Sequence, residues 1–165
     1  MSGYLTASWS DFSVSMVGAS AALTGLLFVA LSINIERILT SDALTARSLS
    51  TMILFVVPLV IGTLLLIPGQ PRTALGVELV AAGIAAGACL LPVNRPRSRG
   101  SLEPRYSWWL FRLLPSVTIA LSLVLAGSSL IAGVGGGLYW VAPAAIEAFL
   151  AGLATVWVLL VEIRR

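Results

Sequence analysis

The stretch FSVSMVGASAALTGLLFVALSINI, from Phe12 to Ile35, decides the fold class of this chain. Its 24 residues include no Asp, Glu, Lys or Arg. At a rise of about 1.5 Å per residue, a helix of this length crosses the roughly 30 Å hydrocarbon core of a bilayer. A second uncharged stretch, SLSTMILFVVPLVIGTLLLIPGQP, runs from Ser48 to Pro71. Two uncharged stretches of this length predict a membrane protein.

The composition of the whole chain agrees with this interpretation. Of its 165 residues, 58% are hydrophobic and only 10% are charged, whereas an ordinary soluble domain has about 25% charged residues. Since most of the chain is needed for membrane spans, no length remains for an extramembrane domain. We therefore expect one all-α domain over residues 1–165, a polytopic bundle of five transmembrane helices.

Prolines, glycines and charges set the limits of the five spans. The segment from Glu36 to Arg47 is predicted to be a polar connector, and the second helix is expected to start at about Asp42 or Ser48. Pro58 is expected to kink that helix without breaking it, as spanning helices allow. Residues 68–71, Pro-Gly-Gln-Pro, are predicted to form a tight turn. The uncharged run from Leu113 to Ile146 is too long for one span, so the glycines of 133–137 are predicted to form a second turn. The expected spans are about 11–35, 48–67, 73–91, 107–132 and 138–161.

The arginines predict the orientation. With five spans, only Arg72 lies on the side of the N-terminus and the other nine arginines lie on or near the opposite side. The positive-inside tendency then puts the N-terminus outside and the C-terminus in the cytoplasm of a bacterium, with the chain as a multi-pass protein of the inner membrane. The arginines expected to contact anionic lipid headgroups on the cytoplasmic face, with Arg112 as a snorkelling side chain, are Arg95, Arg97, Arg99, Arg105 and Arg112. The same distribution accounts for the basic loop without a nucleic-acid partner.

Two carboxyl groups within the spans are candidates for a polar site. Glu147 lies about ten residues into the last span, near the middle of the bilayer, and Glu78 lies closer to a surface, within reach of water or Arg72. Hydroxyl groups expected at the depth of Glu147 belong to Ser20, Thr24 and Ser122. Two interpretations remain open. A neutral Glu147 donates a structural hydrogen bond to such a group, or Glu147 relays protons or cations.

Small residues recur at the spacing of helix contacts, which allows backbones to approach closely in lipid. They are Gly18, Ala22 and Gly25 in the first span, Gly83 and Gly87 in the third, and Ala144, Ala148 and Gly152 in the fifth. These faces serve packing within the chain, or contact between chains in a homo-oligomer.

Enzyme chemistry has no support in the sequence. There is no His and a single cysteine, Cys89, so neither a metal ligand set nor a redox centre can be assembled within one chain. No Gly-x-Ser-x-Gly, phosphate-loop or HExxH motif occurs. We therefore expect no enzyme activity and no cofactor. The predicted function is binding to other membrane helices, as a homo-oligomer or an accessory subunit of a membrane-protein partner. The alternative is a small transporter or channel that uses Glu147 and Glu78.

One resemblance adds to these expectations. The segment from Trp9 to Phe12, followed by Ala21–Asn34 and more weakly by Leu66–Gln70, resembles a family of small multi-span integral membrane proteins from high-GC bacteria whose function is unknown. The resemblance implies that the first span, with its Asp11-Phe12 start, is the defining element of that family.

Overall fold

The apolar stretches of the sequence form helices because only a helix satisfies every backbone polar group within one spanning segment. The computed structural model describes residues 2–94 and 109–163. Five of its helices are long and apolar enough to cross a membrane. The protein is thus an all-α, multi-pass helix bundle. Its helices are α1 (Ser10–Ile33), α2 (Ile35–Leu39), α3 (Asp42–Leu65), α4 (Arg72–Val93), α6 (Leu114–Ala132) and α7 (Val141–Ile163).

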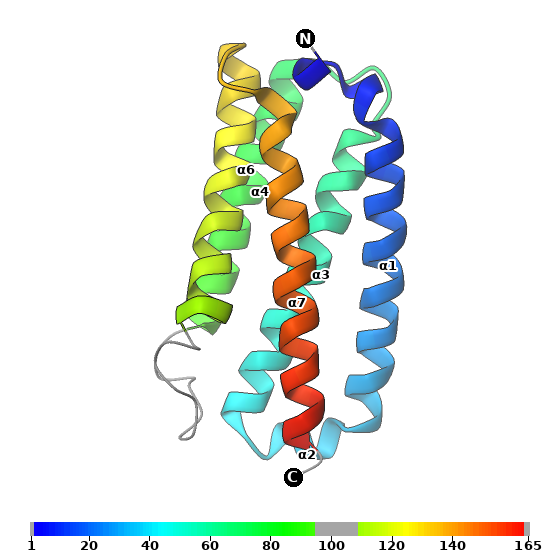
Figure 1. The fold of residues 1–165 in the computed structure, drawn as a ribbon, viewed down its shortest axis with the longest axis vertical. Coiled ribbons are helices and arrows are strands. Elements are labelled where there is room, and N and C mark those ends of the chain that lie inside the picture. Colours follow the sequence, from blue (N-terminus) through cyan, green and yellow to red (C-terminus); the bar gives the residue numbers. More distant parts are fainter. Residues whose placement is uncertain (1, 95–108, 164–165) are drawn as a thin grey trace.

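Short helical turns complete the bundle. The 3-10 turns η1 (Ser2–Tyr4) and η2 (Thr6–Trp9) precede α1, a π-helical turn η4 (Trp109–Leu113) leads into α6, and the 3-10 turn η5 (Gly137–Trp140) leads into α7. Figure 1 shows the five long helices side by side, with α4 behind α6, α1 at one edge next to α3, and α3 crossing behind α7. The beginning of α1 and the end of α7 lie at opposite ends of the bundle, as an odd number of spans requires.

The centre of the core lies between α4 and α6. Leu75, Leu79 and Leu90 of α4 and Ile119 and Leu123 of α6 have no exposed surface. Glycines bring these two helices close together, because a Cβ atom added at Gly83 would lie 2.9 Å from the backbone oxygen of Ala120. The pair α4 and α6 is therefore the most tightly packed part of the protein.

The two sharp turns that the sequence predicts are present. Gly133, Gly135, Gly136 and Gly137 all have a positive φ, between 59° and 104°, which glycine adopts without the steric penalty of a Cβ atom. Gly69, in the turn between α3 and α4, has a φ of 69°. Helix α3 runs through Pro58 without a break, as expected for a spanning helix.

Two expected limits need correction. The segment 36–47 was expected to be a polar connector, but most of it is helical: α2 occupies Ile35–Leu39, and α3 begins at Asp42, the earlier of its two expected starts. Because α3 starts this early, Arg47 belongs to the helix, where it is buried. The last turn of α4 includes Pro92 and reaches Val93, two residues beyond the expected end.

The first residues of the chain lie across the end of the bundle at which α1 begins. The backbone N–H of Gly136 donates to the Tyr4 hydroxyl at 3.0 Å, and the Trp9 ring meets the Tyr139 ring edge-on at 5.1 Å. The guanidinium carbon of Arg72 lies 5.9 Å from the centre of the Tyr4 ring, a cation–π distance. The two N-terminal turns thus pack against the segment between α6 and α7.

Candidate functional site

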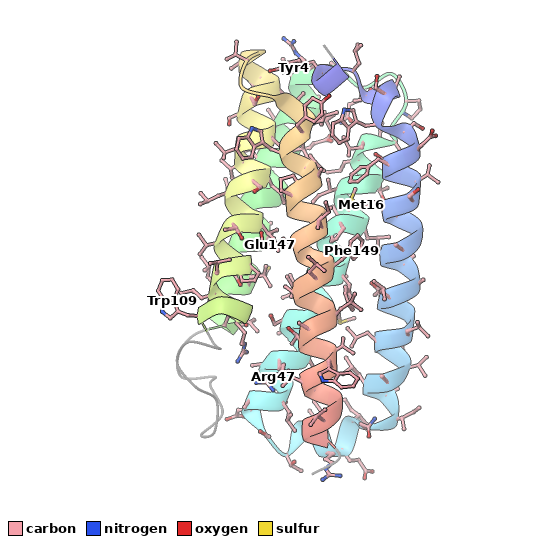
Figure 2. All side chains as sticks on the ribbon, in the orientation of Figure 1. Tyr4, Met16, Arg47, Trp109, Glu147 and Phe149 are labelled. Carbon is pink, nitrogen blue, oxygen red and sulfur yellow. The ribbon has the colours of Figure 1, made fainter. Side chains whose placement is uncertain are left out.

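Glu147 is half-buried in the first third of α7, six residues after the helix begins at Val141 (Figure 2). It borders the inward face of α7, which is formed by small buried residues such as Ala144 and Ala148. Among the residues that the structure describes, Glu147 has no hydrogen-bond or ion-pair partner. Its carboxyl group therefore lies in a span without the structural hydrogen bond that we expected.

The hydroxyl groups expected around Glu147 have other partners or none. Ser20 donates to the backbone oxygen of Phe55 on α3, and Thr24 donates to the backbone oxygen of Ser20 at 2.8 Å. Ser122 is half-buried on α6. The structure thus uses Ser20 to join α1 to α3, and no cluster of Ser20 and Thr24 with Glu147 is formed.

Glu78 has a partner that the sequence did not indicate. The side-chain amide of Gln70, in the turn between α3 and α4, donates from Nε2 to Oε2 of Glu78 at 2.5 Å. Arg72, one of the expected alternatives, is placed over Tyr4 instead. Glu78 and Glu147 are on different helices and share no described partner.

A buried polar cluster lies at the start of α6, and the sequence did not predict it. Nε of Arg112 donates to Oδ1 of Asn94 at 3.1 Å, and Nδ2 of Asn94 donates to Oγ of Ser116 at 2.9 Å. The Ser116 hydroxyl donates in turn to the backbone oxygen of Arg112 at 2.5 Å. The three side chains, which we call the Arg112 cluster, have exposed fractions of 4% (Arg112), 1% (Asn94) and 1% (Ser116).

The Arg112 cluster changes the interpretation of Arg112 itself. Instead of snorkelling toward lipid headgroups, its guanidinium points into the bundle and ties the end of α4 to the start of α6. It belongs to the π-helical turn η4, an uncommon geometry that occurs often at functional sites. The other expected headgroup contacts, Arg95, Arg97, Arg99 and Arg105, lie outside the described residues.

A second buried arginine lies at the same end of the bundle. Arg47 is 4% exposed and lies near the end of the bundle at which α7 ends (Figure 2). The Thr51 hydroxyl donates to the Arg47 backbone oxygen at 2.8 Å. Neighbouring Ser48 is buried, and its hydroxyl has no hydrogen-bond partner in the part of the chain that the structure describes. Polar groups of α3 are therefore buried at this end, rather than exposed in a connector.

The small residues divide into two groups. Gly83 and Gly87 face Ala120 of α6, Gly152 faces the Phe55 ring of α3, and Ala148 has no exposed surface. These faces serve packing within the chain. Gly18 and Gly25 have no heavy atom within 4 Å of an added Cβ, and Ala22 is exposed. Among the small residues that the sequence singled out, only those of α1 thus remain open.

Comparisons with known proteins give no family or function for this geometry. No family model, no curated protein and no solved structure matches the chain. Across residues 2–94 and 109–163, no three His, Cys, Asp or Glu side chains come together in a way that would hold a metal ion. A functional proposal therefore depends on the open face of α1 and on the carboxyl groups within the spans.

Proposed function

We propose that this protein is a non-enzymatic membrane protein that binds other membrane helices through the outward face of α1, as a homo-oligomer or as an accessory subunit. The observation that carries the proposal is the position of Gly18 and Gly25 on a helix that is largely unburied. In the most apolar 18-residue window of the first span, 17% of the residues are buried, against 39% to 50% in the other four spans. Helix α1 therefore presents more of its surface to the membrane than any other span.

The small residues occupy the centre of that surface. At about 100° per residue, Gly18, Ala22 and Gly25 fall within a sector of roughly 60° on the helix. The buried residues of α1, which are Ser13, Met16, Ser20 and Leu27, fall within a sector of similar width on the opposite side. The open glycines thus point directly away from the bundle.

Contact with lipid alone does not require small side chains on the outward face of α1. Apolar helices in a membrane associate through close packing, because hydrocarbon offers no hydrophobic driving force between them, and glycine and alanine allow the closest approach. The other small faces that the sequence indicated, on α4 and α7, already contact a neighbouring helix. A helix of a second copy or of another membrane protein is the partner that fits the face of α1.

The membrane and the orientation are part of the same proposal. We infer a bacterial inner membrane, with the N-terminus outside, from the arginine distribution. The partners are then anionic lipid headgroups on the cytoplasmic side and a neighbouring helix within the bilayer.

Self-association in a bilayer tests the proposal. Energy transfer between copies labelled at the C-terminus is expected to fall when Gly18 and Gly25 are both replaced by leucine, because the larger side chains keep the two backbones apart. The matched control replaces Ala81 and Ala88, two exposed residues of α4, by leucine and is expected to leave energy transfer unchanged. If the wild type does not self-associate, the same pair of variants is compared for co-purification of a membrane protein.

Equal association of the α1 variant and the control would contradict the proposal. Because a Cβ atom added at Gly18 or Gly25 would have no atom of a neighbouring helix within 4 Å, the α1 variant is expected to keep the elution volume and melting temperature of the wild type. Loss of association through misfolding is thereby distinguished from loss of the interface.

The second candidate function is a small transporter or channel that uses Glu147 and Glu78. The observation that favours it is the Glu147 carboxyl group, which lies within a span without a described partner. Proton or cation flux into proteoliposomes, followed with a pH-sensitive dye, is then expected to be lost with Glu147→Gln. The control is Glu36→Gln, at an exposed residue of α2. Wild-type protein without flux would contradict this alternative.

A further inference from the structure

An apolar groove runs along the membrane-facing side of α3 and α4. It has a volume of about 370 Å³ and is lined by α3 side chains between Leu49 and Ile61 and by Ala82, Ala85, Ala86 and Cys89 of α4. The α3 side is built from large aliphatic side chains, whereas the α4 side is built from alanines that are too short to fill the gap. The tight contact of α4 with α6 on its opposite face holds α4 in this position.

The dimensions of the groove fit one lipid chain. From Leu49 to Ile61 the groove follows α3 for about 18 Å, at about 1.5 Å per residue. One acyl chain spans about 15 Å, half of the hydrocarbon core. A helix, with a diameter of about 10 Å or more, is too wide for a groove of this volume. No polar side chain along the groove would hold water.

A carboxyl group lies one helical turn beyond the residues that line the groove. Glu78 precedes Ala82 by one helical turn, so Glu78, Ala82, Ala85 and Cys89 lie along one face of α4. The hydrogen bond from Gln70 draws the Glu78 carboxyl group toward the turn between α3 and α4, at the end of the bundle. Oε1 of Gln70 is buried and accepts no hydrogen bond from the described part of the chain. The half-buried Glu78 carboxyl group is therefore the acceptor available to a ligand at this end of the bundle.

We propose that this groove is a lipid-binding site, which takes one acyl chain of a phospholipid whose headgroup carries a primary ammonium group. The chain lies against α3 and the alanines of α4. The ammonium group donates to the Glu78 carboxylate. Charge complementarity selects this headgroup, since Glu78 attracts a cation and a headgroup with only a phosphate lacks both the positive charge and the N–H donors.

Native mass spectrometry of the full chain tests the site. The protein, purified in a mild detergent, is offered equal amounts of phosphatidylethanolamine, phosphatidylcholine and phosphatidylglycerol with identical acyl chains. We expect one phosphatidylethanolamine retained per chain, about tenfold over each of the others. Phosphatidylcholine keeps the positive charge but has no N–H donor, and phosphatidylglycerol has no ammonium group. Equal retention of the three lipids would overturn the proposal.

Two matched pairs of variants place the bound lipid. Ala85→Trp fills the groove and is expected to abolish retention, whereas Ala88→Trp, at an exposed residue outside the groove, is expected to leave it unchanged. Glu78→Gln is expected to remove the headgroup preference, and Glu147→Gln to preserve it. Retention that survives Ala85→Trp would overturn the proposal.

A second copy of the chain is the competing occupant of the groove, and the single cysteine can detect it. Cys89 lines the groove and is exposed, so a second copy seated there would bring two such thiols together. Oxidation of the protein in native membranes is expected to leave it monomeric on a non-reducing gel. A covalent dimer formed through Cys89 would place a second copy, and not a lipid, in the groove.

Discussion

Ser20 on α1 donates its hydroxyl hydrogen to the backbone oxygen of Phe55 on α3, three residues before Pro58. Proline lacks the N–H group that continues the helical ladder, and its ring disturbs the preceding turn. The carbonyl left without its helical donor is that of Leu54, four residues before Pro58, and the Phe55 carbonyl that Ser20 binds is its neighbour in the same disturbed turn. The weakened turn of α3 is therefore stabilised by α1, and the two helices are joined there.

The first prediction concerns this hydrogen bond. Ser20→Ala is expected to lower the free energy of unfolding by about 1 kcal/mol, the size of a hydrogen bond between helices in a membrane. The control is Ser15→Ala, at an exposed residue of the same helix. Thermal unfolding in detergent measures both. Equal melting temperatures of the two variants would show that Ser20 does not stabilise α3.

The Arg112 cluster gives the second prediction. Asn94→Ala removes the acceptor of the Arg112 Nε hydrogen bond and leaves part of a buried cation unsatisfied, which is expected to cost about 1–3 kcal/mol. Arg112→Lys is also expected to be less stable than the wild type, because an ammonium group cannot reproduce the planar guanidinium contact with Asn94. A double-mutant cycle on Asn94 and Arg112 measures the coupling. Additive effects would argue against a direct interaction.

Glycines on opposite sides of the bundle give the third prediction. Gly83→Ala forces a Cβ atom against the backbone of Ala120 and is expected to destabilise the fold by about 1–3 kcal/mol through overpacking. Gly25→Ala meets open space and is expected to be neutral, or stabilising by about 0.5 kcal/mol, because alanine loses less conformational freedom in a helix. The melting temperatures of the two variants compare the sites. A harmless Gly83→Ala would contradict the close contact of α4 and α6.

The orientation is the subject of the fourth prediction. Alkaline phosphatase, which is active only outside the cytoplasm, is expected to be inactive when fused after Arg165. It is expected to be active when inserted after Gly69, in the turn between α3 and α4. This outcome follows from the arginine distribution. The reversed pattern of activity would reverse the assignment of the two sides.

The number of spans was predictable because length and hydropathy alone determine it. The turn at 133–137 was predictable as well, since four of its glycines adopt positive φ angles. The inward faces were not predictable. In a membrane span both faces are apolar, so the sequence does not indicate that Gly83 faces α6 while Gly18 faces outward.

The polar contacts were hidden for a related reason. Asn94 and Arg112 are separated by a long polar stretch and meet only because α4 and α6 pack side by side with their ends aligned. Gln70 was expected to be part of a turn and nothing more, yet its amide reaches back to Glu78. Such pairs depend on helix rotation, which sequence spacing alone does not specify.

The hydrogen bond between Gly136 and Tyr4 has a consequence for biosynthesis. Its partners are 132 residues apart in the chain. At a synthesis rate of about 5–20 residues per second, the first turns of the chain wait roughly 7–26 s for the glycine loop to be made. Until then Tyr4 and Trp9 lack their partners in the loop and in η5. The first span lies in the membrane during this time without these contacts. The end of the bundle at which α1 begins is therefore completed only after the glycine loop has been made.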